Sequence, residues 1–231
     1  MKYSLSNIEE YSWSYKYFLE HHIDIFSSAI SFLIKDSEST IRANSKKLNS
    51  LKSQDETLKH LTDEVRAQYE SQIYGQYEEI DYSIAENYRL GVFLAIFRNF
   101  EIICRDIEKD LFNNATTDND GRDFLKKFKN AVEKELGIPY SKFQNEYNKV
   151  KSLALLRNYL THSSGFITSK EADKLGPLLF NGVLVKKIDG QNAIVKIKES
   201  LFLKEALETV CDFLYEISDQ IEDQHKSNHN N

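Results

Sequence analysis

The sequence contains few of the residues that end helices, with eight glycines and two prolines among 231 residues. Such a shortage of turn-forming residues predicts long helices joined by few loops. Apolar residues make up 41% of the chain and aromatic residues 12%, which is typical of a folded protein with a substantial core. We therefore expect a mainly helical fold.

The sequence also lacks an excess of positive charge. Its formal net charge is −6, which argues against a broad basic surface that binds duplex DNA through its phosphates. A local basic cleft that binds RNA is compatible with this charge. The net charge therefore disfavours a protein that binds duplex DNA over a broad surface and leaves RNA binding in a local cleft open.

Cysteines and long apolar runs are scarce as well. Cys104 and Cys211 lie in apolar helical patterns, so we expect buried free thiols in a reducing compartment. The longest apolar run, residues 90–97, is much shorter than the roughly 20 residues that span a bilayer. Glu9 and Glu10 stand where a secretory signal peptide would be apolar. These features predict a cytoplasmic protein with no membrane segment.

The N-terminal third of the chain is predicted to be helical, with two different surfaces. Over residues 6–34, apolar side chains recur at three- and four-residue steps, as in an amphipathic helix. Residues 36–74 are more polar, and their narrow apolar stripe is typical of a helical arm packed on one neighbour. Gly75 marks a predicted break. We assign residues 1–76 to an N-terminal helical arm.

Residues 77–222 are expected to form one helical domain, followed by a flexible tail at residues 223–231. Apolar spacing predicts four helices in this domain, at residues 77–112, 122–136, 141–162 and 203–221. Between the last two, short β-branched segments flank Asp189-Gly190-Gln191 and predict a β-hairpin over about residues 180–197.

A candidate chemical site lies near the end of the helix predicted at residues 141–162. If that helix begins with a capping box at Ser141, Arg157 falls on the same stripe as Phe143 and needs an anion, since an unpaired buried guanidinium is costly. His162 would lie about 140° further around the helix. The two converge only if the helix ends there or if two copies meet across a two-fold axis. The alternative for Arg157 is a structural ion pair.

The order Arg157, Asn158, three further residues and His162, followed by Ser163-Ser164-Gly165 at a helix end, resembles the signature of the HEPN superfamily. In that family the motif lies near the end of the penultimate main helix. A β-hairpin and a final helix follow it in several subfamilies. The resemblance covers roughly residues 77–222. It implies a HEPN-like helical bundle over these residues, and it does not explain the long N-terminal helices that we expect to extend this bundle.

The resemblance implies RNA cleavage without a metal or other cofactor, at a site shared by two copies in a homodimer. His162 would transfer a proton as general acid or base. Arg157 would hold the scissile phosphate, and Asn158 would orient the histidine or the substrate. Some family members also use an acidic residue from a neighbouring helix. Glu101 is the candidate here, with an ion pair to an arginine one turn away as its alternative.

Proteins of this family commonly act as toxins or in defence against phage. The resemblance therefore implies an RNA substrate and an antitoxin or defence-system partner protein, with no membrane partner. The competing hypothesis is a non-catalytic HEPN-like helical protein that serves in binding or assembly. In that case Arg157 would form a structural ion pair, and the arm at residues 36–74 would be an interaction module.

Overall fold

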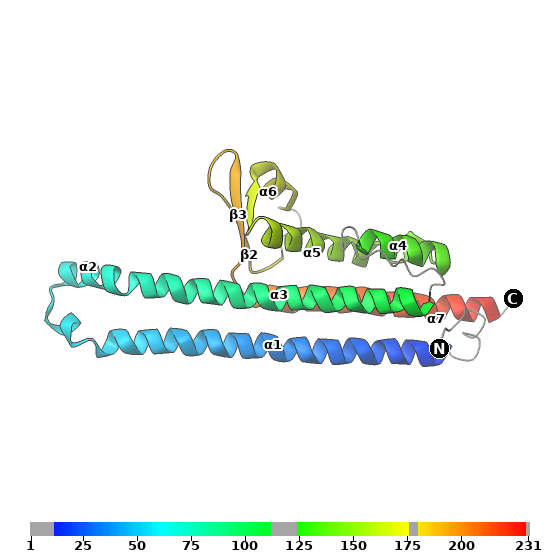
Figure 1. The fold of residues 1–231 in the computed structure, drawn as a ribbon, viewed down its shortest axis with the longest axis horizontal. Coiled ribbons are helices and arrows are strands. Elements are labelled where there is room, and N and C mark those ends of the chain that lie inside the picture. Colours follow the sequence, from blue (N-terminus) through cyan, green and yellow to red (C-terminus); the bar gives the residue numbers. More distant parts are fainter. Residues whose placement is uncertain (1–11, 112–123, 176–179, 230–231) are drawn as a thin grey trace.

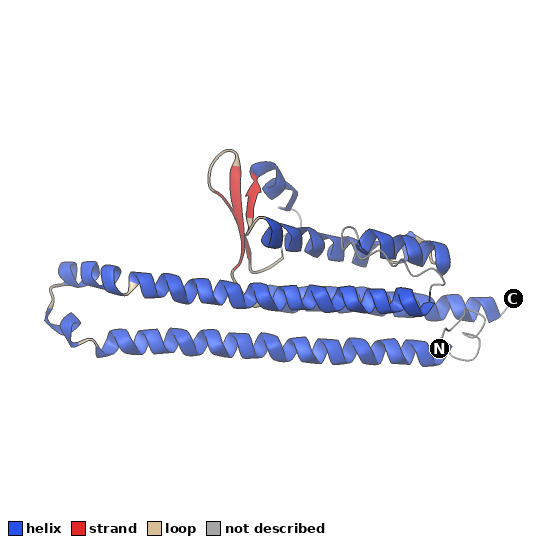
Figure 2. Ribbon diagram, viewed as in Figure 1, coloured by secondary structure: helices blue, strands red, loops and turns tan. Residues whose placement is uncertain are grey.

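The computed structural model describes residues 12–111, 124–175 and 180–229 (Figure 1). As the sequence predicts, the protein is mainly helical, with a small antiparallel sheet before the last helix (Figure 2). The elements in chain order are α1 (Ser12–Gln54), η2 (Glu56–His60), α2 (Asp63–Ile73), α3 (Gly75–Leu111), α4 (Phe124–Glu135), η3 (Tyr140–Lys142), α5 (Gln144–His162), β1 (Phe166–Thr168), α6 (Ser169–Leu175), β2 (Val183–Lys187), β3 (Asn192–Ile197) and α7 (Leu201–His229).

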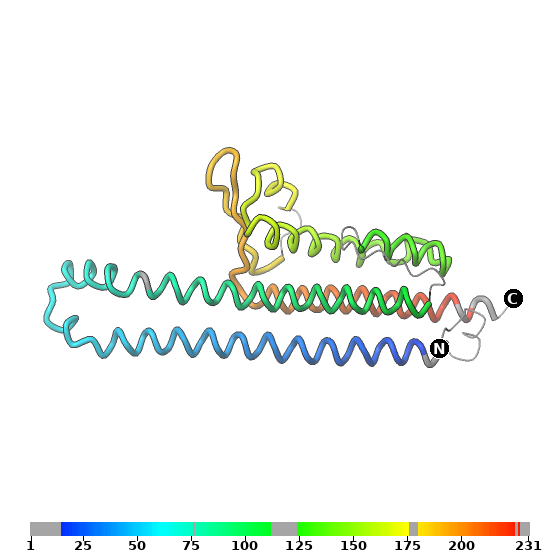
Figure 3. The backbone as a smooth tube through the Cα atoms, in the orientation of Figure 1, coloured from blue at the N-terminus to red at the C-terminus, as the bar shows by residue number. Residues whose placement is uncertain are grey.

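Three long helices form the body of the molecule. Helices α1 and α3 run antiparallel along its length, and α7 packs against both (Figure 3). Helices α4 and α5 pack on this layer, and the sheet with α6 lies at the end of α5 (Figure 1). Helix α7 continues through residues 223–229, part of the segment predicted as a flexible tail. None of the helices in the described parts of the chain is long and apolar enough to cross a membrane.

The two predicted N-terminal segments are replaced by a helical hairpin in which α1 packs on α3, and α2 directly precedes α3. Helix α1 runs unbroken to Gln54, and the chain then reverses through η2 into α2, which ends just before the break predicted at Gly75. Only Lys35 lies between the two predicted segments, and there is no glycine or proline at this point to end the helix. The division at residue 76 stays a prediction, and the hydrophobic core includes side chains from both sides of it, such as Ile23 and Phe93.

Aromatic side chains fill the core between α3, α4, α5 and α7. The ring of Phe213 on α7 lies 5.8 Å from that of Phe100, 6.1 Å from that of Phe128 and 6.3 Å from that of Phe143, each in an edge-to-face arrangement. Such pairs contribute about 0.5–1.5 kcal/mol each beyond the burial of their surface. Both cysteines are buried free thiols, as predicted. Phe143 directly precedes α5, so its ring contact with Phe213 packs the start of α5, the helix that carries the candidate site, against α7.

The predicted β-hairpin is confirmed as β2 and β3. In its turn, the Asp189 carboxylate accepts hydrogen bonds from the backbone N–H groups of Gln191 and Asn192, both at 2.7 Å. Hydrogen bonds from the Asn192 side chain, together with these two backbone bonds, lower the pKa of Asp189. The sequence did not predict β1, which pairs with the other edge of β3 and gives the strand order β1-β3-β2.

Candidate functional site

The start and the buried face of α5 differ from the prediction. Ser141 does not cap the helix, because it lies in the short 3-10 helix η3. Helix α5 begins only after η3, at Gln144. The predicted stripe is buried only in its first part, at Phe143, Tyr147 and Val150. Further along α5 the buried apolar side chains are leucines rather than Ala154 and Arg157 of that stripe. The core-facing leucines in this part of the helix are Leu153, Leu156 and Leu160. Arg157 therefore lies at the edge of the buried face and is partly exposed.

The end of α5 is built by the three residues that follow His162. The carbonyl oxygen of Tyr159 accepts hydrogen bonds from the Ser163 hydroxyl at 2.6 Å and the Gly165 N–H at 3.1 Å. Ser164 and Gly165 both take positive φ angles, 51° and 81°, which turn the chain out of the helix. Val195 on β3 then donates a backbone hydrogen bond to the Gly165 carbonyl at 2.8 Å. The sheet thus anchors the helix end that carries His162.

Arg157 and Asn158 lie in contact. The Arg157 Nη1 donates a hydrogen bond to the Asn158 Oδ1 at 3.1 Å. Within residues 12–111, 124–175 and 180–229, no carboxylate forms an ion pair with Arg157, so the structural ion pair considered from the sequence is not formed there. An amide oxygen does not neutralise a guanidinium, and the remaining N–H groups of Arg157 are available to bind an anion.

His162 is exposed as the last residue of α5. Its imidazole forms no hydrogen bond or ion pair with any residue in the described part of the chain, and this holds for Arg157 and Asn158 as well. One chain therefore places the histidine and the arginine on one helix end without joining them. The expectation that the two do not share one face of the helix stays a prediction.

Glu101 on α3 is held by two arginines of its own helix. Its carboxylate lies 2.5 Å from the Arg105 Nη2 and 3.5 Å from the Arg98 Nη1, and the residue is 8% exposed. This is the alternative arrangement that the sequence left open. No contact in the described residues joins Glu101 to Arg157. A role for Glu101 in binding or orienting RNA stays a prediction.

Comparison with known proteins gives no relative for this chain. No family model, no curated protein and no solved structure matches it. Among the described residues, no three His, Cys, Asp or Glu side chains lie close enough together to hold a metal ion.

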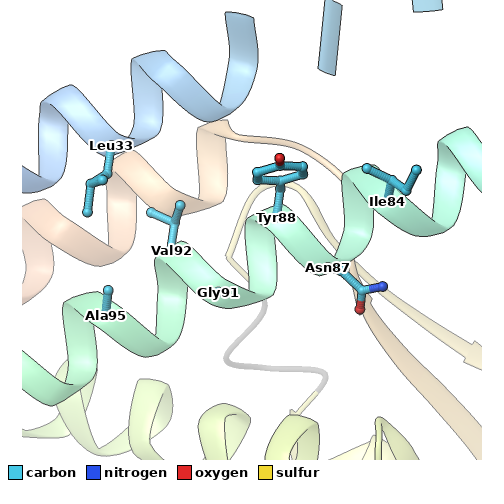
Figure 4. Close-up of a pocket in the computed structure, with 7 residues that line it drawn as sticks. All are labelled: Leu33, Ile84, Asn87, Tyr88, Gly91, Val92 and Ala95. Atoms are coloured by element: carbon cyan, nitrogen blue, oxygen red, sulfur yellow. The ribbon is translucent and has the colours of Figure 1, made fainter. Parts of the chain in front are cut away.

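A second surface feature is an apolar groove of about 480 Å³ between α1 and α3 (Figure 4). Leu33 of α1 and Val92 of α3 point toward each other across it (Figure 4). The groove is lined by Leu33, Ile84, Asn87, Tyr88, Gly91, Val92 and Ala95. The sequence analysis did not predict this groove, although Ile84, Tyr88 and Val92 recur at four-residue steps and so fall on one face of α3.

Proposed function

We propose that the protein is a metal-independent endoribonuclease of the HEPN type that acts as a homodimer. The observation that carries the proposal is the state of Arg157. Its guanidinium is oriented by Asn158, is not neutralised by a carboxylate of the described chain, and stands on the same helix end as the exposed His162. A phosphodiester supplies the anion that such an arginine binds best.

The reaction follows from the chemistry of these two side chains. His162 removes the proton of the 2′-hydroxyl, and the 2′-oxygen attacks the adjacent phosphorus. The bond from phosphorus to the 5′-oxygen breaks, and the departing oxygen takes a proton from His162 of the second copy. Arg157 stabilises the charge on the non-bridging oxygens. The products are a 2′,3′-cyclic phosphate and a 5′-hydroxyl.

A homodimer supports this reaction better than a single chain. His162 makes no contact with Arg157 of its own helix, so one chain leaves the proton donor and the phosphate-binding group apart. Two helix ends that face each other across a two-fold axis would bring two arginines and two histidines to one phosphate. In this proposal the enzyme acts in the cytoplasm as a toxin or in defence against phage, with an antitoxin or defence-system partner protein.

A second candidate function is binding or assembly without catalysis. The observation that favours it is the apolar groove between α1 and α3, in which the lining residues Leu33 and Tyr88 are 42% and 44% exposed. Contiguous exposed apolar surface of this kind marks sites of protein–protein contact. The groove lies on different elements from Arg157, so the two functions are separable by mutation.

The test is cleavage of total cellular RNA in EDTA by the wild type and by His162→Ala and Arg157→Gln. The proposal expects the wild type to degrade the RNA and both variants to leave it intact. His60→Ala is the matched control, because His60 is exposed in η2 and belongs to no candidate site. If the wild type and His162→Ala leave RNA equally intact, the nuclease proposal is wrong and the binding function is favoured.

A further inference from the structure

A second concave site lies away from α5, between the second half of α1, the middle of α3 and the start of α7. The cleft has a volume of about 390 Å³, within the range of roughly 300–1,000 Å³ that is common for small-molecule sites. Four basic and two acidic side chains line it, namely Arg42, Arg89, Lys198, Lys204, Glu38 and Glu199. Basic residues are therefore in excess here, although the whole chain carries a net charge of −6.

Arg89 is the most informative residue of the cleft. It is partly buried, and its Nε is fully buried with no hydrogen-bond partner. Across the described residues, no hydrogen bond or ion pair to Arg89 is formed by any other side chain. Leaving a charged donor buried and unpaired is costly. The two Nη atoms of Arg89 are not among the fully buried atoms, so an anion in the cleft would pair with them and offset the charge of the guanidinium.

The neighbouring charges leave the cleft positive. Glu38 forms long ion pairs of 3.8 Å with both Arg42 and Lys204, and its single negative charge offsets only one of these two positive charges. Lys198 is already paired, with its Nζ 2.6 Å from a Glu86 carboxylate oxygen. Burial lowers the pKa of Lys198, which indicates that its ammonium group is partly shielded from water.

The start of α7 adds to this positive field. Ser200 lines the cleft, and its carbonyl accepts the first backbone hydrogen bonds of the helix, from the N–H groups of Leu203 and Lys204. A helix N-terminus carries a partial positive charge that favours anions. Helix α7 spans 29 residues, so its N-terminus contributes this charge beside four basic side chains.

We propose that this cleft binds the phosphate groups of a small organic polyphosphate of the nucleotide class. Arg89 and Lys204 would bind the phosphates, and the apolar side chains of Ile41 and Leu201, which also line the cleft, would contact the organic part. A long polyanion such as RNA fits less well. The basic cluster is confined, and Glu38 and Glu199 lie in its wall.

The inference does not rest on the proposed nuclease activity, because the cleft shares no residue with the end of α5. The test is isothermal titration of the full chain with ATP, with inorganic pyrophosphate and with a single-stranded RNA oligonucleotide in EDTA. To prevent cleavage of the RNA, that titration uses an oligonucleotide that is 2′-O-methylated throughout. Saturable binding of ATP is expected, with weaker binding of pyrophosphate and no binding of the RNA at this site.

Arg89→Gln is expected to weaken ATP binding about tenfold to a hundredfold, the loss that one charge-assisted contact produces. The matched control is Arg66→Gln, which removes an arginine on α2 that pairs with Glu70 and lies outside the cleft. This control is expected to bind ATP like the wild type. Lys204→Gln, at a residue that is half-exposed, serves as a second variant if Arg89→Gln fails to fold.

Three results would overturn the inference. One is the absence of saturable binding of both ATP and pyrophosphate. Another is that Arg89→Gln and the Arg66→Gln control weaken ATP binding to the same extent, or that neither weakens it. The third is that the protein binds the RNA but not ATP, and that Arg89→Gln abolishes the binding of the RNA. This result would assign the cleft to a polynucleotide.

Discussion

Replacing Gly165 with alanine is expected to destabilise the protein through the end of α5. Gly165 has a φ of 81°, and a Cβ at this position would lie 2.3 Å from the carbonyl oxygen of Val195. That carbonyl belongs to the backbone of β3, so it is not free to rotate away as a flexible side chain would. The backbone of Gly165 or of β3 must therefore move to accept the added methyl group.

The size of the effect follows from two costs. A left-handed conformation costs an L-residue about 1–2 kcal/mol relative to glycine. Movement of Gly165 also weakens its hydrogen bonds to Tyr159 and Val195, each worth about 0.5–1.5 kcal/mol. We expect a loss of about 2–5 kcal/mol in the free energy of unfolding. For a chain of this size that corresponds to a fall of about 5–15 °C in Tm.

The assay is urea unfolding followed by circular dichroism, supported by a thermal melt. Gly190→Ala is the control, because Gly190 has no left-handed φ and a Cβ there would meet no atom within 4 Å. We expect the control to change the free energy of unfolding by less than about 0.5 kcal/mol. If Gly165→Ala proves as stable as Gly190→Ala, the backbone of β3 does not approach residue 165 closely enough to exclude a Cβ atom, and the prediction is wrong.

Two further predictions concern α1 and α3. Hydrogen bonds from Lys16 and Lys226 lower the pKa of Glu222 from 4.5 to about 2, so this group stabilises the fold above about pH 4.5 and loses that effect as the pH falls toward 2. Lys16→Met should reduce this loss, so the difference in free energy of unfolding between wild type and variant should be largest at pH 6 and should shrink steadily as the pH falls toward 2. A difference in urea unfolding that stays constant over this range would contradict the prediction. Gly91→Ala, inside α3 with no atom within 4 Å of the new Cβ, should stabilise the protein by about 0.5–1 kcal/mol, and a lower Tm would contradict it.

The features that the sequence predicted well are local ones. The hairpin of β2 and β3 was predictable because Asp189 specifies the turn through hydrogen bonds of its carboxylate to residues two and three positions further on. The last helix was predictable because its apolar residues keep one helical period over five turns. Strand β1 was not predictable, since Phe166–Thr168 is only three residues long and pairs with β3, some 25 residues further on.

The position of Arg157 shows why helix phase is harder to predict than helix extent. Apolar residues lie on several sides of α5, and both Ala154 and Leu153 fit a helical stripe. The contacts of α5 with α7 decide that Leu153 and Leu156 are buried, which leaves Arg157 at the edge. The unpaired Arg89 was missed for a related reason, because its cleft is formed by three helices far apart in the sequence.

The most direct test of the central proposal is the cleavage rate of one labelled RNA oligonucleotide in EDTA, beside the same oligonucleotide with 2′-O-methyl groups. We expect the wild type to cleave only the unmodified RNA and His162→Ala to be slower by at least about 100-fold, since general acid–base catalysis contributes on that scale. Equal rates for the wild type and His162→Ala, or cleavage of the methylated RNA, would contradict the proposal that His162 acts through the 2′-hydroxyl.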